Sequence, residues 1–98
     1  MQECGINRSE LSMKKIIMFM QAGCPYCIRA KAIQQQLLNE AAYAGIHIEM
    51  IDENLHPEIA DLYDYFFVPS YYYNGRKLHE GAAEQGDLRR IFESVAAN

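Results

Sequence analysis

The first half of the chain carries three apolar patterns that together predict two parallel strands joined by a helix. Residues 15–20 form a short, almost continuous apolar run, typical of a strand buried on both faces. From Cys24 to Gly45 apolar residues recur at spacings of three and four, as on one helix face, and residues 46–52 then alternate. Strands joined by a helical crossover lie parallel in one sheet. This βαβ unit is the strongest constraint on the fold.

The predicted crossover helix begins at Cys24 and ends at Gly45, because glycine readily adopts the left-handed conformation that closes many helices. Glutamate, lysine and glutamine side chains are expected on its outer face. Its inner stripe consists of Ala30, Ile33, Leu37, Leu38 and Ala41.

The second half predicts a short helix, a hairpin and a terminal helix. Pro57 suits a first helical turn, and the expected buried face of this helix consists of Ile59, Leu62, Tyr63 and Phe66. Strand patterns at residues 68–73 and 76–80 flank an Asn-Gly pair, which favours a two-residue turn with positive φ at both positions. The last helix follows Gly81, and its apolar stripe consists of Leu88, Ile91, Phe92 and Val95.

The predicted order is β-α-β-α-β-β-α, an α/β domain whose four-stranded mixed sheet is flanked by three helices. The chain has 98 residues, of which 50% are hydrophobic, and this suffices for one core. We predict a domain over residues 14–98 and a flexible tail over residues 1–13, which are mostly polar and aperiodic. The consecutive tyrosines 71–73 are expected to pack in the core and on the surface, because strand residues alternate between faces.

Charge and hydropathy exclude two classes of partner. The net charge is −4 and the basic residues are scattered, which argues against binding of nucleic acid or an anionic membrane. The longest apolar stretch, residues 16–20, is far shorter than the roughly 20 residues that cross a bilayer. Residues 1–12 lack the pattern of a secretory signal. We therefore expect a cytoplasmic protein, and we expect it to act as a monomer.

The motif Cys24-Pro25-Tyr26-Cys27 lies where the first strand pattern gives way to the helix. Free backbone N–H groups at a helix start favour an anion, so the thiolate form of Cys24 is expected to be stabilised. Cys27 lies three residues later and faces the same side of the helix. The spacing predicts that Cys24 attacks a disulfide and that Cys27 resolves the mixed disulfide. Pro25 is expected to keep the sulfurs close, and Tyr26 to form part of the rim.

A zinc site is the main alternative for a close cysteine pair. A closed zinc site needs four ligands, and the other candidates are Cys4, His47, His56 and His79, which lack ligand spacing. We therefore predict redox chemistry, no bound metal and no role for the histidines. Cys4 is expected to be an incidental thiol in the tail.

The run CPYCIRAK at residues 24–31 resembles the active site of dithiol glutaredoxins, which belong to the thioredoxin superfamily. The resemblance covers about residues 14–97, and Val68-Pro69 falls where the family keeps a cis-proline beside the cysteines. It implies a thioredoxin-like fold in which the backbone of Val68 pairs with an extended substrate segment. It also implies that Pro69 keeps other groups, metals included, away from the sulfurs.

The chain departs from the glutaredoxin pattern at positions that bear on the substrate. Three residues before the first cysteine, glutaredoxins usually carry a lysine or arginine, and this chain has Gln21. The residues that hold the γ-glutamyl end of glutathione in that family are replaced by EGAAE at residues 80–84, which is more similar to thioredoxins. Yet the position where thioredoxins bury an aspartate is Met18, and the motif is not WCGPC. The sequence therefore combines a glutaredoxin-like cysteine motif with a somewhat thioredoxin-like C-terminal half.

The resemblance implies a thiol–disulfide oxidoreductase that reduces disulfide-containing or glutathionylated proteins without a bound cofactor. Glutathione is the expected co-substrate, and the alternative is a thioredoxin-type enzyme reduced by a flavoprotein reductase. An iron–sulfur cluster carrier is disfavoured by Pro25 beside Cys24, and a redox-inert binding module is disfavoured by the retention of both cysteines. Arg29 and Lys31 are expected to be solvated on the outer helix face rather than to steer an anionic substrate.

Overall fold

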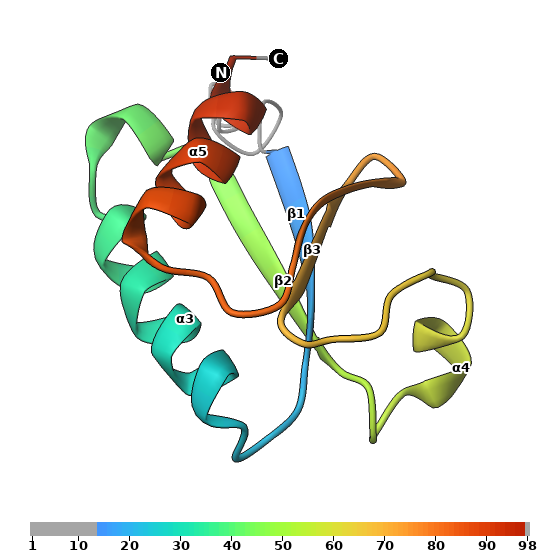
Figure 1. The fold of residues 1–98 in the computed structure, drawn as a ribbon. Coiled ribbons are helices and arrows are strands. Elements are labelled where there is room, and N and C mark those ends of the chain that lie inside the picture. Colours follow the sequence, from blue (N-terminus) through green and yellow to red (C-terminus); the bar gives the residue numbers. More distant parts are fainter. Residues whose placement is uncertain (1–13, 98) are drawn as a thin grey trace, which may run out of the picture.

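A computed structural model describes residues 14–97, which form a four-stranded sheet with helices on both faces (Figure 1). The elements are β1 (Lys14–Met20), α3 (Pro25–Leu37), the 3-10 helix η1 (Ala41–Tyr43), β2 (Ile46–Asp52), α4 (Pro57–Ala60), β3 (Ser70–Tyr73), β4 (Arg76–Glu80) and α5 (Gln85–Ala96). The predicted order and the mixed sheet are confirmed. The tail predicted for residues 1–13 lies outside the described residues.

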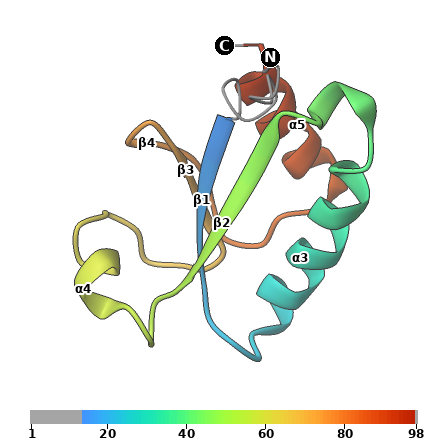
Figure 2. The same cartoon turned by 180° about the vertical axis from the view of Figure 1, so that it is seen from behind.

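The strands lie in the order β2-β1-β3-β4. β1 pairs in parallel with β2, as the crossover pattern predicts, and antiparallel with β3, where Phe19 lies opposite Ser70. The carboxyl ends of β1 and β2 and the start of β3 therefore lie at one end of the sheet, and both views of the ribbon show this (Figures 1 and 2). Cys24 and Pro69, which adjoin these strand ends in the sequence, are thereby brought to the same end.

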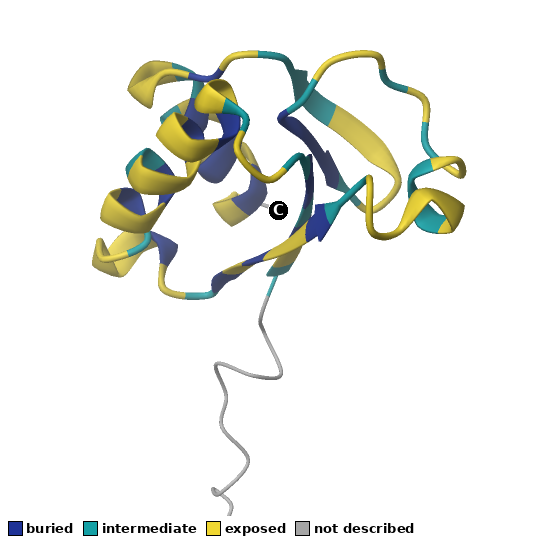
Figure 3. Cartoon of the chain, turned by 90° about the horizontal axis from the view of Figure 1, so that it is seen from below, coloured by how far each residue is buried: buried dark blue, intermediate teal, exposed yellow. Residues whose placement is uncertain are grey.

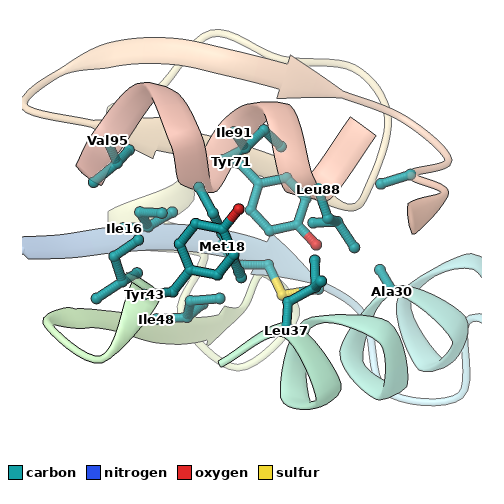
Figure 4. Packing of buried hydrophobic residues seen from close by; sticks show 13 residues of the cluster. Ile16, Met18, Ala30, Leu37, Tyr43, Ile48, Tyr71, Leu88, Ile91 and Val95 are labelled. Atoms are coloured by element: carbon teal, nitrogen blue, oxygen red, sulfur yellow. The ribbon is translucent and has the colours of Figure 1, made fainter. Parts of the chain in front are cut away.

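The larger core lies between the sheet and the helices α3 and α5, which cover one of its faces (Figures 2 and 4). The stripe predicted for α5 is buried along its whole length, as expected. Tyr71 is fully buried in this core, and Tyr43 packs edge-to-face on Phe92 with 5.5 Å between ring centroids. Aromatic pairs of this geometry add to the stabilisation from buried area.

A smaller core covers the opposite face of the sheet, on the side of α4. Phe19 and Tyr72 are its buried aromatic members. Phe19 stacks on Tyr65 with 5.0 Å between ring centroids and is tilted against Tyr63 at 4.7 Å. The tyrosines of β3 thus divide between the two cores, which confirms that consecutive strand residues pack on alternate faces.

The crossover helix ends at Leu37, so the predicted end at Gly45 is wrong. A turn follows, and η1 then buries Tyr43, whose hydroxyl donates to Glu93 of α5 at 2.5 Å. An uninterrupted helix would instead direct the small Ala41 inward, and the aromatic ring removes more apolar area from water. The glutamines do not all lie outside either, because Gln34 is buried and its side-chain oxygen accepts a hydrogen bond from the Tyr71 hydroxyl at 2.9 Å.

The second predicted helix is reduced to the single turn of α4, so the buried face expected up to Phe66 is wrong. Leu62 and Phe66 are 80% and 87% exposed, and this segment is largely yellow in Figure 3. Beyond α4 the chain bends so that Tyr63 and Tyr65 both reach the sheet, a spacing that a helix does not permit. The carboxylate of Glu80 accepts the backbone N–H groups of residues 66 and 67 at 2.5 and 2.8 Å and holds the bend.

The hairpin is confirmed, with φ values of 52° at Asn74 and 79° at Gly75. β3 begins at Ser70, two residues later than the strand pattern suggests, and Pro69, which precedes it, has no backbone N–H to donate to the ladder. The Val68-Pro69 peptide bond is cis. Among residues 14–97, no helix is long and apolar enough to cross a membrane.

Candidate active site

Cys24 caps the amino end of α3 after the loop that leaves β1. Gly23 adopts a φ of 82°, a left-handed conformation that favours glycine, and thereby turns the chain into the helix. The carbonyl of Cys24 accepts the N–H of Ile28 at 2.9 Å, and Pro25 is the first helical residue. The proline, which lacks an N–H donor, stands where a helix leaves that donor unpaired in any case.

The pKa of Cys24 lies below the ordinary value of a thiol. Hydrogen bonding from the backbone N–H of Cys27 is the largest cause, burial opposes it, and the Cys27 thiol and the N–H of Tyr26 lower the pKa further. These donors belong to the first turn of α3, where backbone N–H groups have no partner within the helix. The direction predicted from the helix start is confirmed.

The pKa of Cys27 is raised to about 11, chiefly because the thiol is desolvated. This side chain is 2% exposed, and the negative charges of Cys24 and Glu53 add to the effect, while the backbone N–H of Gln21 opposes it. Both cysteines are free thiols in this structure. The pair therefore consists of a half-buried sulfur whose pKa is lowered and a buried sulfur that keeps its proton at neutral pH.

We expect iodoacetamide to alkylate Cys24 and to spare Cys27 when the reduced protein is treated at pH 7. Only the thiolate reacts, so the alkylation rate at Cys24 should reach half its maximum below the pH at which a free cysteine does. Peptide mapping after a short exposure measures the labelling at each position. Equal labelling of the two cysteines would contradict the assigned asymmetry.

Pro69 and Val68, which the resemblance assigns to substrate binding, lie beside the start of β3 at the same end of the sheet. The Val68-Pro69 bond is cis, as expected, and the carbonyl of Pro69 accepts the N–H of Gly81 at 2.8 Å. Val68 is half-buried, whereas Tyr26 is 60% exposed at the rim of the cysteine pair. Their contacts with a substrate stay predictions.

A cavity of about 210 Å³ adjoins Cys27 on the sheet face that α3 covers. Its walls include Met18, Met20 and Met50, and Ile28 and Lys31 also line it. Met18 is fully buried here, so the place where thioredoxins carry a buried aspartate is apolar in this chain.

Glu53 is a carboxylate near the site whose negative charge raises the pKa of Cys27, and the sequence analysis missed it. Its side chain accepts hydrogen bonds from the amide of Gln21 and from the hydroxyl of Tyr65, the latter at 2.6 Å. The signal was available, because Glu53 directly follows β2 and the carboxyl ends of parallel strands meet at one edge. What the sequence could not show is that Gln21 and Tyr65, from two different loops, converge on the same carboxylate.

Arg29, on the helix face outside the site, forms an ion pair with Glu84. The Arg29 Nε lies 3.0 Å from the Glu84 carboxylate, and both side chains are more than half exposed. The pairing neutralises the charge that an anionic substrate would meet. This arrangement agrees with the prediction that Arg29 does not steer substrates.

No group of three or more histidine, cysteine, aspartate or glutamate side chains is arranged to bind a metal ion in the part of the chain that the structure describes. His79 contacts the carbonyl oxygen of Ala82 at 3.0 Å, remote in sequence from the cysteine pair. Cys4 lies outside the described residues.

Comparison with solved structures finds thioredoxins of low sequence identity. The oxidised thioredoxin of Plasmodium falciparum superposes with a TM-score of 0.69 at 17% identity, over 98% of this chain and 93% of that one. Fasciola hepatica thioredoxin gives 0.68 at 18% identity, over 95% and 89%. A mutant thioredoxin of Halobacterium salinarum gives 0.66 at 19% identity, over 84% and 74%. These likenesses establish the fold.

No curated protein matches the sequence. The family model described as "Thioredoxin domain" does match it, over residues 13–93. That range covers β1, the cysteine motif, the cis-proline and most of α5. The comparisons favour thioredoxins and give no specific support to the glutaredoxin interpretation of the motif. The chain belongs to the thioredoxin domain family.

Proposed function

We propose that this protein reduces disulfide bonds in other proteins, as a thioredoxin-type thiol–disulfide oxidoreductase. The observation that carries the proposal is the contrast between the two thiols of the motif. The pKa of Cys24 is lowered at a helix start, and the pKa of the buried Cys27 is raised to about 11. A two-step disulfide reduction requires a nucleophilic thiolate beside a second, protonated thiol that resolves the mixed disulfide.

In the first step the Cys24 thiolate attacks one sulfur of the substrate disulfide. A bond forms between Cys24 and that sulfur, and the other substrate sulfur leaves as a thiolate. In the second step Cys27 loses its proton and attacks the Cys24 sulfur, which releases the second substrate thiolate. The substrate gains two electrons, and the protein is left with a Cys24–Cys27 disulfide.

The charges around the site support a protein substrate over glutathione. The amide of Gln21, which stands where glutaredoxins usually carry a cation, donates to Glu53. Arg29 is paired with Glu84, so this cation and the Gln21 amide already face carboxylates, and Lys31 is the cation that lines the cavity beside Cys27. Ala83 is 2% exposed in the stretch that corresponds to the glutathione clasp. A tripeptide with two carboxylates therefore finds few free positive partners here.

The electron donor under this proposal is a flavoprotein disulfide reductase, which regenerates the two thiols. Glutathione is the second candidate, and the CPYC sequence is the observation that favours it. A reductase-dependent protein should reduce protein disulfides, and a glutathione-dependent protein should reduce glutathione mixed disulfides. Assays of both activities with one preparation of the protein therefore distinguish the two electron donors.

The test is NADPH oxidation in two coupled assays with the same purified protein. One assay contains insulin and thioredoxin reductase, and the other contains a glutathione mixed disulfide, glutathione and glutathione reductase. We expect turnover in the insulin assay and little above background in the glutathione assay. Turnover with glutathione alone would overturn the thioredoxin-type proposal and assign a glutaredoxin activity.

A further inference from the structure

The most exposed large apolar side chains among residues 14–97 lie in one stretch of the chain, around and after α4. They are between 68% and 87% exposed and belong to Leu55, Leu62, Phe66 and Phe67. This part of the fold is largely yellow in Figure 3. We refer to residues 52–67 as the α4 segment. Large apolar side chains that gather on one exposed segment mark a site of interaction.

The charge of the α4 segment restricts the partner that it fits. It carries five carboxylates and neither lysine nor arginine, and the sequence has no lysine or arginine between Lys31 and Arg76. In the part of the chain that the structure describes, none of these carboxylates pairs with lysine or arginine. The five carboxylates are Asp52, Glu53, Glu58, Asp61 and Asp64. An apolar surface with unneutralised negative charge complements a partner that is basic and partly apolar.

Two other occupants of this surface are disfavoured by the same charge. A second copy of the chain would bring the same carboxylates to the other side of a symmetric interface, because each copy presents the same patch. Like charges that face each other across an interface are destabilising. An anionic membrane surface is repelled for the same reason. A basic segment of another protein remains as the partner.

A cavity of about 320 Å³ lies within the α4 segment. Its walls include two carboxylates and three aromatic rings, those of Glu53, Asp61, Tyr63, Tyr65 and Phe66. Two of these rings are held in place, because Tyr63 and Tyr65 pack on Phe19 with 4.7 and 5.0 Å between ring centroids. Carboxylates beside aromatic rings are the groups with which an arginine guanidinium pairs and stacks.

A single residue connects this cavity with the nucleophile. Gln21 donates its side-chain amide to Glu53, and the backbone carbonyl of Gln21 accepts the N–H of Cys24 at 3.2 Å. On the other side, Phe67 directly precedes Val68 and the cis-proline. A side chain a few positions from the substrate cysteine can therefore reach the cavity while the substrate disulfide faces Cys24.

We propose that this cavity binds the side chain of an arginine that lies a few residues from the reactive cysteine of the substrate protein. The inference rests on the proposed function, because it names the class of protein disulfide that Cys24 attacks. Asp61 pairs with the guanidinium, since this carboxylate is exposed, whereas Glu53 is already bound by Gln21 and Tyr65. Lysine fits less well, because it lacks the planar group that stacks on a ring and pairs at two points.

The test measures how fast the reduced protein reacts with short peptides that share one sequence apart from a single residue. Each peptide carries one cysteine in a mixed disulfide with thionitrobenzoate, and attack by Cys24 releases the coloured thiolate. The varied residue is arginine, lysine or glutamine, placed at successive positions on either side of the cysteine. The protein carries Cys4→Ser, so that Cys24 and Cys27 are its only thiols.

We expect arginine at one or two positions to raise the second-order rate constant about fivefold over glutamine, the size of a strong exposed ion pair. Lysine should give a smaller advantage. Asp61→Asn should reduce the advantage of arginine to less than about twofold and leave the glutamine peptides unchanged. Glu49→Gln is the matched control, because it removes the same charge from an exposed carboxylate of β2 that pairs with Lys15 at 3.1 Å. It should keep the advantage.

Equal rate constants for the arginine and glutamine peptides at every position would overturn the inference. An advantage that survives in Asp61→Asn, or that falls equally in Glu49→Gln, would also overturn it, because long-range charge would then suffice. Sedimentation is the further check, since a dimer that Phe66→Ala dissociates would mean that a second copy covers the α4 segment. A parent protein that reacts with none of the peptides would instead refute the proposed function, so the two failures are distinguishable.

Discussion

Replacing Cys24 by serine is expected to reduce the catalysed rate of insulin reduction by on the order of 10³-fold or more, to the rate of dithiothreitol alone. A serine hydroxyl does not ionise at neutral pH, so the N–H groups at the start of α3 have no thiolate to stabilise. The turbidity of precipitating insulin B chain measures the rate. A Cys24→Ser variant as active as the parent would refute the assigned nucleophile.

Cys27→Ser is the companion variant, because it keeps the nucleophile and removes the resolving thiol. It should form the mixed disulfide with insulin and stop there, so the substrate accumulates covalently on Cys24. Electrophoresis without reductant detects the trapped complex. Cys4→Ser is the control for the loss of a cysteine as such, and it should retain the activity of the parent.

The largest stability effect is expected for Phe92→Ala. Phe92 is fully buried in the core between the sheet and α5, where its ring packs against Tyr43. Removal of a buried aromatic ring loses its transfer free energy and leaves a cavity, which together cost about 3–5 kcal/mol. Urea denaturation of the reduced protein should show this as a lower midpoint at a similar slope.

Phe66→Ala is the matched control, because the same side chain is 87% exposed after α4. Its free energy of unfolding should change by no more than about 0.5 kcal/mol, as for most surface substitutions. A loss at Phe66 equal to that at Phe92 would mean that the segment after α4 is packed, as the helical spacing suggests, and would contradict the described fold.

The elements predicted well are those in which one local sequence pattern indicates the structure and no tertiary contact opposes it. β2 and the hairpin alternate or carry their turn residues, and α5 repeats its stripe over three turns, so local pattern and tertiary packing agree. The segment after Pro57 fits a helical pattern just as well, yet it is not helical beyond Ala60. There the backbone contacts of Glu80 and the packing of two tyrosines on Phe19 override the spacing, and neither is visible in a local window.

The active-site prediction covers the residues whose chemistry is encoded in adjacent positions of the sequence. Cys24, Pro25 and Cys27 could be assigned from a helix start and a spacing of three, because the contacts that matter are local. Glu53, Tyr65 and Gln34 could not, because their partners lie between 12 and 37 residues away in the chain. From sequence alone, a polar residue in a helical pattern is expected to face the solvent. Gln34 is buried instead, because the hydroxyl of Tyr71 donates a hydrogen bond to its side-chain oxygen.

The most direct test of the central claim is the state of the cysteines after one turnover. The reduced protein is mixed with insulin, quenched with acid, alkylated and mapped by mass spectrometry. We expect a single intramolecular disulfide that joins Cys24 to Cys27, with Cys4 alkylated. Recovery of both motif cysteines as alkylated thiols, or of a disulfide that involves Cys4 in their place, would contradict the claim that this pair carries the electrons.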